Sequence, residues 1–193
     1  MDYEYENQRF EGLDLVEESV SCCEFTECEF VNCSFENVEV LSCSFLDCTF
    51  VNCRFHNVTG QRTLMRSSVF EDCTLTSIDW THWASGSAFY DPFTKLNGCK
   101  MKYNQFTSMN LNKFNFSGCE ILDSLFGECQ LVSSNFTGCN LDKTEFFRCN
   151  LSKADFRRAT GYRVDLMTAQ LKGAKFSFPE VVNLLYSLGI KIE

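Results

Sequence analysis

Residues 23–57 read CEFTE CEFVN CSFEN VEVLS CSFLD CTFVN CRFHN, a run of seven five-residue units. The third residue of each unit is apolar, usually phenylalanine, and the first is cysteine in every unit but one. A period of five matches neither the 3.6-residue period of an α-helix nor the two-residue period of a plain strand. Internal repetition therefore has to be explained before any helix or strand is assigned.

The five-residue period continues along most of the chain in two arrays that differ in phase. In the first array the apolar residues fall on multiples of five, from Phe10 to Trp80. In the second array they fall one residue later, from Met101 to Phe176. We therefore expect one continuous solenoid domain with a first array at 1–90, a phase-shifting break at 91–95, a second array at 96–176 and a tail at 177–193.

Four units per turn would make a four-sided coil in which positions i and i+20 stack. The alternation of extended backbone then turns the bulky residue inward, together with the small residue two positions before it. In the second array Phe alternates with Met, Leu or Ile at every second unit, which an even-sided coil allows and a triangular one does not. Gly60, at a core position, predicts a small bulge. The expected core of the two arrays includes Phe25, Phe30, Phe35, Phe45, Phe50, Phe55, Phe106, Phe116, Phe126, Phe136, Phe146 and Phe156.

Twelve of the thirteen cysteines lie two residues before a bulky core position, and only Cys22 does not. Free cysteine behaves as a small, readily buried apolar residue, and the chain contains no CxxC pair. We expect reduced cysteines that fill the core, with no metal and no cofactor, and the alternative is a peptide- or metal-binding use of the thiols. The acidic N-terminus lacks a signal-peptide pattern, and no apolar run approaches the about 20 residues of a membrane span, so we expect a cytoplasmic protein without a membrane partner.

Negative charge is concentrated at one end of the chain. Residues 1–60 hold 13 acidic and 2 basic side chains, whereas residues 61–193 hold 13 and 15. An acidic half repels nucleic acid and favours a basic partner surface, although it also serves solubility. Aromatic residues crowd the break, which is either a structural kink or a further contact patch. The expected partner-contact residues are Glu24, Glu27, Glu29, Glu36, Glu39, Asp47, Trp83, Phe89, Tyr90 and Phe93.

The tail after Phe176 changes to a helical period. Ser177 and Glu180 have the spacing of a capping box, Pro179 suits a first turn and Gly189 suits a helix end. A short amphipathic α-helix here would cover the last coil and block strand addition to an open edge. It carries more apolar residues than a cap needs, which predicts a homodimer interface formed by Val181, Val182, Leu184, Leu185 and Leu188.

Units such as CEFTE, CSFEN, CNLDK, CNLSK and ADFRR resemble the A(D/N)LXX consensus of pentapeptide-repeat proteins, and the resemblance covers about 160 of the 193 residues. It implies an all-β fold, the right-handed quadrilateral β-helix, here with a short C-terminal α-helix as a cap. The tail is also similar to that of the quinolone-resistance group of this family. That group dimerises through its C-terminal elements, mimics duplex DNA in width and charge, and binds and protects DNA gyrase or topoisomerase IV.

The resemblance therefore predicts a protein-binding DNA mimic that binds and protects or inhibits bacterial gyrase or topoisomerase IV and does not itself bind nucleic acid. The alternative is a general interaction scaffold with a different protein partner. The sequence contains none of the common catalytic motifs that we sought, and its two histidines, His56 and His82, fall on the expected outer surface or at the break. We therefore expect no enzymatic activity.

Overall fold

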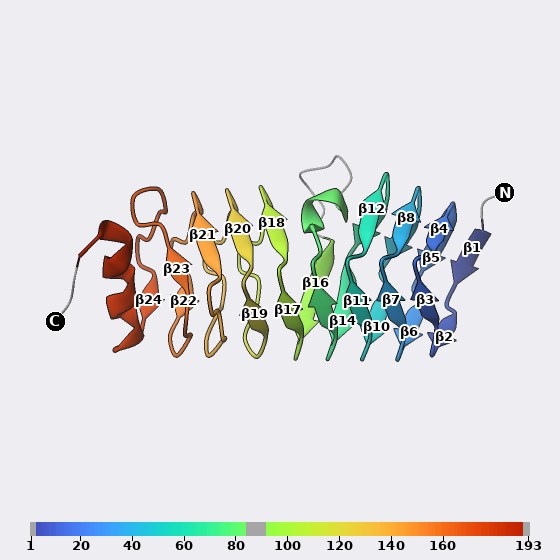
Figure 1. The fold of residues 1–193 in the computed structure, drawn as a ribbon, viewed down its shortest axis with the longest axis horizontal. Helices are drawn as coiled ribbons and strands as arrows, with labels where there is room; N and C mark the ends of the chain where they lie inside the picture. Colours follow the sequence, from blue (N-terminus) through green and yellow to red (C-terminus); the bar gives the residue numbers. More distant parts are fainter. Residues whose placement is uncertain (1–2, 84–91, 191–193) are drawn as a thin grey trace. The chain divides into compact units, whose positions relative to one another are not determined.

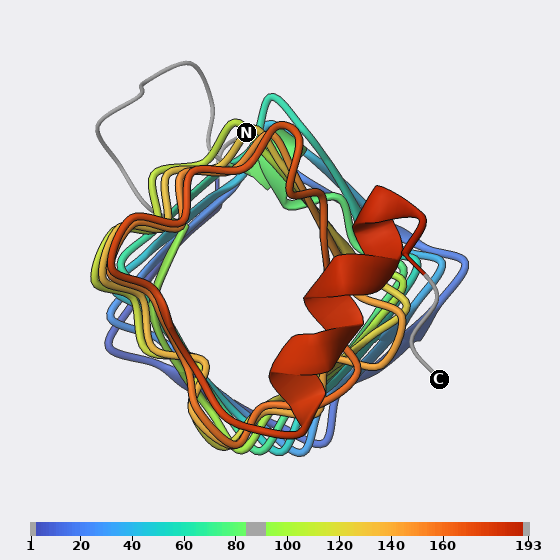
Figure 2. The same ribbon diagram turned by 90° about the vertical axis from the view of Figure 1, so that its left-hand side faces the viewer.

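The computed structural model describes residues 3–83 and 92–190; the expected contact residues Phe89 and Tyr90, and Asp91 of the expected break, lie outside them. The chain divides into two compact units, Met1–Lys100 and Met101–Glu193. Each unit is a stack of four-sided coils made from short parallel strands (Figures 1 and 2). The predicted all-β solenoid is therefore confirmed.

In the first unit the strands form four sides, and each side is a sheet of parallel strands. The first side contains β1 (Tyr3–Glu6), β5 (Cys23–Thr26), β9 (Ser44–Leu46) and β13 (Leu64–Arg66). The second contains β2 (Arg9–Glu11), β6 (Glu29–Val31), β10 (Thr49–Val51), β14 (Ser68–Glu71) and β16 (Phe93–Asn97). The third contains β3 (Asp14–Val16), β7 (Ser34–Glu36), β11 (Arg54–His56) and β15 (Thr74–Thr76). The fourth contains β4 (Ser19–Ser21), β8 (Glu39–Leu41) and β12 (Thr59–Gln61), which contacts the short 3₁₀ helix η1 (Trp80–Trp83).

In the second unit several sides are joined by single bridges rather than by regular strands, as between Asn115 and Asn135. The longest sheet contains β18 (Gln105–Thr107), β20 (Leu125–Gly127), β21 (Glu145–Phe147) and β23 (Arg163–Val164). Two further pairs are β17 (Lys100–Lys102) with β19 (Glu120–Leu122), and β22 (Asp155–Phe156) with β24 (Lys175–Phe176). The unit ends in the helix η2 (Glu180–Leu188).

Positions i and i+20 stack directly, so the inward phenylalanines form columns. Ring centroids are 4.9 Å apart between Phe30 and Phe50 and 4.5 Å apart between Phe106 and Phe126, with nearly parallel planes. Columns that face each other across the interior meet edge to face, as Phe116 and Phe126 do at 5.6 Å. Both geometries are favourable for aromatic rings. All the predicted core phenylalanines are buried except Phe35, which is half-buried.

The small inward position makes a hydrogen bond between coils. Its thiol or hydroxyl donates to a carbonyl oxygen of the preceding coil, as in Cys139 Sγ to Phe116 O at 3.0 Å and Ser134 Oγ to Leu111 O at 2.7 Å. Thr63 Oγ1 donates to Val40 O at 3.0 Å in the same way. Cysteine, serine and threonine therefore alternate at this position because each is small and each carries a donor.

A third position of each repeat, two residues after the bulky one, forms the corner of the coil. Its φ is positive, for example 51° at Glu27, 53° at Asn32 and 54° at Asp47. Asn, Asp and Gly adopt this left-handed conformation most readily, which explains their frequency at corners. Cys22, the one cysteine outside the core pattern, occupies such a corner with φ 55° and is exposed.

The insertion between the arrays is longer than the one extra residue that the sequence suggests. Phe50 pairs with Phe70 in a regular coil, but Phe70 then pairs with Leu96 instead of with position 90. Ser68 and Val69 pair with Phe93 and Lys95, which leaves Thr94 as a bulge inside the expected break. An insertion of six residues shifts the phase of a five-residue repeat by one residue, as an insertion of one residue does. The periodic pattern therefore could not distinguish the two insertions.

Trp83 fills the interior opposite Gly60, which corrects two expectations. Gly60 pairs regularly with Val40 and forms no bulge. A Cβ atom there would lie 3.2 Å from the Trp83 indole, so the glycine makes room for that ring. Trp83 and Phe93 are 3% and 0% exposed, and the prediction that their side chains contact a partner is therefore wrong. Burial of large aromatic side chains stabilises the fold.

The terminal helix η2 is a 3₁₀ helix, which corrects the predicted α-helix, and its expected capping box is absent. Ser177 Oγ accepts a hydrogen bond from Arg158 N at 3.1 Å. Glu180 Oε1 accepts hydrogen bonds from Gly161 N and Asn183 Nδ2, both at 2.8 Å. These contacts attach the helix to the preceding coil, across which it lies (Figure 2). No helix within the described residues has the length and apolar character to span a membrane.

Candidate partner-binding surface

The first side of the first unit carries exposed carboxylates on three successive coils, and we call these residues the acidic side. The inward turn of each Phe leaves the residues beside it pointing outward. Glu4 of β1 and Glu24 of β5 pair in register, one coil apart. The acidic side consists of Glu4, Glu6, Glu24, Glu27 and Asp47, all of which are exposed.

These carboxylates are not neutralised within the part of the chain that the structure describes. None of the five forms an ion pair there. Arg9, on the second side, contacts Glu11 and Glu29 instead. Like charges on neighbouring strands, about 4.8 Å apart, destabilise each other. A basic partner would relieve this repulsion.

The structure brings together only half of the acidic residues predicted to contact a partner. Glu24, Glu27 and Asp47 share the acidic side, whereas Glu29, Glu36 and Glu39 lie on β6, β7 and β8, one on each of the other sides. The sequence interpretation omitted Glu4 and Glu6. The i, i+20 relation between Glu4 and Glu24 is the signal that could have found the first of them.

The first three coils have a linear charge density close to that of duplex DNA. Residues 3–62 contain twelve acidic and three basic side chains. Three coils at about 4.8 Å each span about 14 Å, which corresponds to one net negative charge per about 1.6 Å. Duplex DNA carries one charge per about 1.7 Å of its axis. A surface that binds the DNA backbone would therefore encounter a similar charge density here.

Burial suppresses the reactivity of the Cys48 and Cys139 thiols. Twelve cysteines are buried and only Cys22 is exposed. Burial raises the pKa of Cys48 and of Cys139 to about 12, so both remain protonated at neutral pH. Among the described residues no group of three or more His, Cys, Asp or Glu side chains is placed to hold a metal ion.

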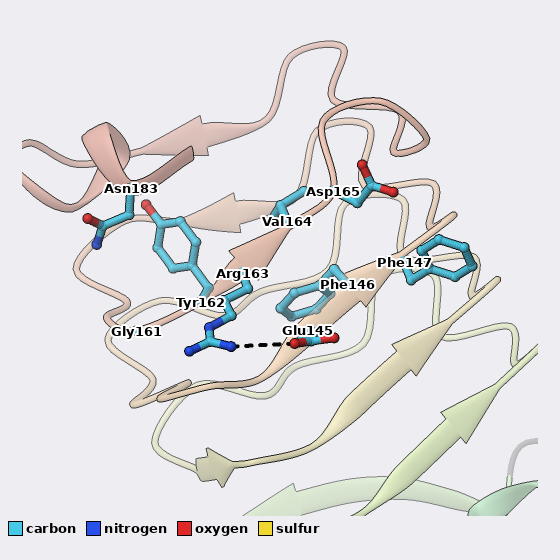
Figure 3. A pocket seen from close by; sticks show the side chains of 9 residues that line it. All are labelled: Glu145, Phe146, Phe147, Gly161, Tyr162, Arg163, Val164, Asp165 and Asn183. Carbon is cyan, nitrogen blue, oxygen red and sulfur yellow. Dashed lines mark ion pairs between the residues drawn. The ribbon is translucent and has the colours of Figure 1, made fainter. Parts of the chain in front are cut away.

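A hollow in the second unit arises where one coil is shorter than its neighbours (Figure 3). Glu145 pairs with Arg163, two positions earlier than the regular register with position 165. Tyr162 thereby occupies the inward position that a small residue usually holds, as Thr144 does one coil earlier. Its side chain is 3% exposed. Val164 pairs with Phe146 in the core column, whereas Leu166, which the period places in the core, is only half-buried.

This hollow is a pocket of about 600 Å³ whose charged groups already have partners. Arg163 Nη1 lies 3.5 Å from Glu145 Oε1 (Figure 3). Asp165 Oδ2 accepts a hydrogen bond from Thr168 Oγ1 at 2.7 Å. The Tyr162 hydroxyl has no hydrogen-bond partner among the described residues. Burial, with the nearby Glu180 carboxylate, raises its pKa to about 12, so it is neutral at physiological pH. The pocket thus contains a neutral phenol beside paired charges rather than an activated acid or base.

A family model described as a pentapeptide repeat region matches residues 23–86 and 115–184. The chain belongs to the pentapeptide repeat family. This pentapeptide repeat protein has no significant match among curated protein sequences.

Solved structures provide two informative comparisons for this pentapeptide repeat protein. HetL, a pentapeptide repeat protein involved in heterocyst differentiation regulation from the cyanobacterium Nostoc sp. strain PCC 7120, is 12% identical, with 90% of this chain and 87% of that chain covered and a TM-score of 0.51. Full-length QnrB1, a plasmid-mediated fluoroquinolone resistance protein, is 21% identical, with 94% and 100% covered and a TM-score of 0.40. At such identities the likeness to HetL shows a shared fold and nothing about a partner.

Proposed function

We propose that this pentapeptide repeat protein is a non-enzymatic binding scaffold that mimics DNA and binds bacterial DNA gyrase or topoisomerase IV through its acidic side. The observation that carries the proposal is the charge density of the first three coils, one net charge per about 1.6 Å, against about 1.7 Å for duplex DNA. A topoisomerase holds DNA on a basic surface, and a rigid stack of coils presents its carboxylates to such a surface without loss of backbone entropy.

Reversal of charge on the acidic side should strongly weaken this binding. We expect the Glu24→Lys, Glu27→Lys, Asp47→Lys triple variant to inhibit gyrase supercoiling about 100-fold more weakly than the native chain, because attraction becomes repulsion at three exposed positions. The matched control is Glu128→Lys, Asp142→Lys, Glu145→Lys, which makes the same charge change in the second unit and should inhibit as the native chain does.

The supercoiling assay should include a quinolone, since protection and inhibition are separate readouts of the same contact. Native protein that neither inhibits supercoiling at about 10 μM nor relieves quinolone inhibition would refute the proposal; that concentration corresponds to weak but specific binding. Capture of a different partner that loses affinity for the triple variant would instead support the general scaffold with another target.

We further propose that the protein dimerises through η2. Leu184 is buried against the last coil, and Val181 and Val182 are half-buried. Leu185 and Leu188 are 39% and 44% exposed and leave an apolar surface that water does not favour. A second copy related by a two-fold axis would cover both surfaces at once.

Leu185→Arg should convert the dimer to a monomer. A guanidinium at the centre of an apolar contact would be buried without a partner, so the mass by light scattering should fall to the 22.2 kDa of one chain. Met167→Arg is the control, because Met167 is 78% exposed and lies outside the helix. An unchanged mass for Leu185→Arg, or a native chain that is already monomeric, would contradict dimerisation through η2.

A further inference from the structure

One side of the second unit, together with the corner regions at its two ends, carries five basic side chains on the last two coils, and we call these residues the basic side. Asp155 and Lys175 pair in register, and Lys153 N donates a hydrogen bond to Lys172 O at 2.9 Å. Arg158 N donates to Ser177 Oγ at 3.1 Å, at the far corner of the same side. The basic side consists of Lys153, Arg157, Arg158, Lys172 and Lys175, all of which are exposed.

Most of this positive charge has no partner within the chain as described. Arg157 forms an ion pair with Asp155, with Nη2 and Oδ2 2.6 Å apart. The hydrogen bond from Arg157, with a smaller contribution from Lys175, lowers the pKa of Asp155. The other four basic side chains of this side form no ion pair among the described residues. The coil before them carries Asn135 and Thr137 on the same side, so the charge is confined to the end of the repeat.

We propose that the basic side of one copy of this protein binds the acidic side of a second copy. Both are flat sides of parallel-strand coils, so their charges repeat with the same spacing of about 4.8 Å between coils. Carboxylates of Glu4 and Glu24, one coil apart, can therefore face ammonium groups on adjacent coils of the other copy, such as those of Lys153 and Lys175. Opposite potentials with matching spacing steer association and fix its register.

The two oppositely charged sides of the chain favour a second copy over nucleic acid as the occupant. The net charge of −9 opposes the approach of either one. A second copy is attracted to that side and has its own unpaired carboxylates neutralised in the same contact. The acidic side cannot bind a second copy and an external basic partner at once, so self-association would limit binding of that partner, whatever its identity.

Salt dependence separates this contact from an apolar one. Exposed charges further apart than about 10 Å are screened at 0.1 M salt, and the screening length falls to about 3 Å at 1 M. The native chain at about 100 μM should therefore show a larger average mass by sedimentation at about 0.05 M salt than at 0.5 M, with an association constant at least about tenfold higher. Apolar association through η2 is not weakened by salt in this way.

Two charge-reversal variants test whether these two sides bind each other. Variant one is Lys153→Glu, Lys172→Glu, Lys175→Glu, and variant two is Glu24→Lys, Glu27→Lys, Asp47→Lys. Each alone should lose the mass increase at low salt, because its two sides then carry charge of the same sign. An equimolar mixture should regain the increase, because the native acidic side of variant one can bind the native basic side of variant two. The two reversed sides are also opposite in sign.

The matched control is Lys102→Glu, Lys143→Glu, Arg148→Glu, which changes the charge equally elsewhere in the second unit and should associate as the native chain does. Circular dichroism should confirm that each variant keeps its β-sheet signal. Three results would overturn the proposal: a native mass that does not depend on salt, a mixture no larger than its components, or a control that also fails to associate. Salt-dependent binding of a short DNA duplex that variant one loses, without self-association, would assign the basic side to nucleic acid instead.

Discussion

Replacement of Phe126 by alanine should lower the free energy of unfolding by about 4 kcal/mol, within the range for large buried aromatic side chains. Phe126 is 0% exposed and stacks on Phe106 and Phe146 at ring-centroid distances of 4.5 and 4.9 Å. It also meets Phe116 and Phe136 edge to face at 5.6 and 5.9 Å. The variant loses the buried area and interrupts a column that continues through neighbouring coils, which cannot collapse because their hydrogen bonds set the spacing.

Phe147→Ala is the matched control, because Phe147 is the same residue type on β21 but points outward and is 40% exposed. It should cost less than about 1 kcal/mol, as surface substitutions usually do. Urea unfolding followed by circular dichroism measures both. Equal losses for the two variants would mean that the inward column does not stabilise the second unit more than its surface does.

Gly161→Ala should destabilise the protein by about 3 to 4 kcal/mol, whereas Gly138→Ala should cost only about 1 to 2 kcal/mol. Both glycines have positive φ, 73° and 71°, so both variants incur the cost of the left-handed conformation. A Cβ at Gly161 would lie 2.5 Å from Asp142 Cα, which is backbone and cannot move aside, whereas nothing lies within 4 Å of a Cβ at Gly138. The next coil already has a side chain at the Gly138 corner, in Arg158, with φ 61°.

The difference in stability between the two glycine variants measures the cost of the close contact between residue 161 and Asp142 in the shortened coil. Gly161 N also donates to Glu180 Oε1, so displacement of this backbone should loosen η2 as well. Urea unfolding gives the two losses, and limited proteolysis reports whether cleavage within η2 becomes faster in Gly161→Ala. A Gly161→Ala variant as stable as Gly138→Ala would contradict the tight packing of the short coil against Asp142.

Expectations drawn from the five-residue period are wrong where a coil loses residues and the loss is compensated a few residues later, because the phase of the repeat is then unchanged on both sides. The period places Leu166 in the core, but Val164 occupies that position. A two-residue shortening before Arg163 is compensated before Gln170, which again pairs with Asn150, so the phase at both ends looks undisturbed. The pocket lined by Tyr162 lies within this interval and had no signal in the periodic pattern.

The acidic residues illustrate a similar limit for the candidate site. Their abundance in residues 1–60 is evident from the sequence, but the gathering of Glu4, Glu6, Glu24, Glu27 and Asp47 on one side depends on the four-sided coil and its corners. Buried and exposed aromatics could not be distinguished in advance either. Trp83 looked available for a partner, and its burial follows from Gly60, which is remote in sequence and leaves space for the indole.

The period of five was sufficient to predict the solenoid, its inward phenylalanines and the place of the cysteines in the core, because a strict repeat puts every side chain either inside or outside the same coil. Three properties emerged only from the folded chain: which charges share a side, where a coil is longer or shorter than its neighbours, and how η2 attaches to the last coil. These properties depend on contacts between residues far apart in the chain, such as Gly161 with Glu180, which no local pattern encodes.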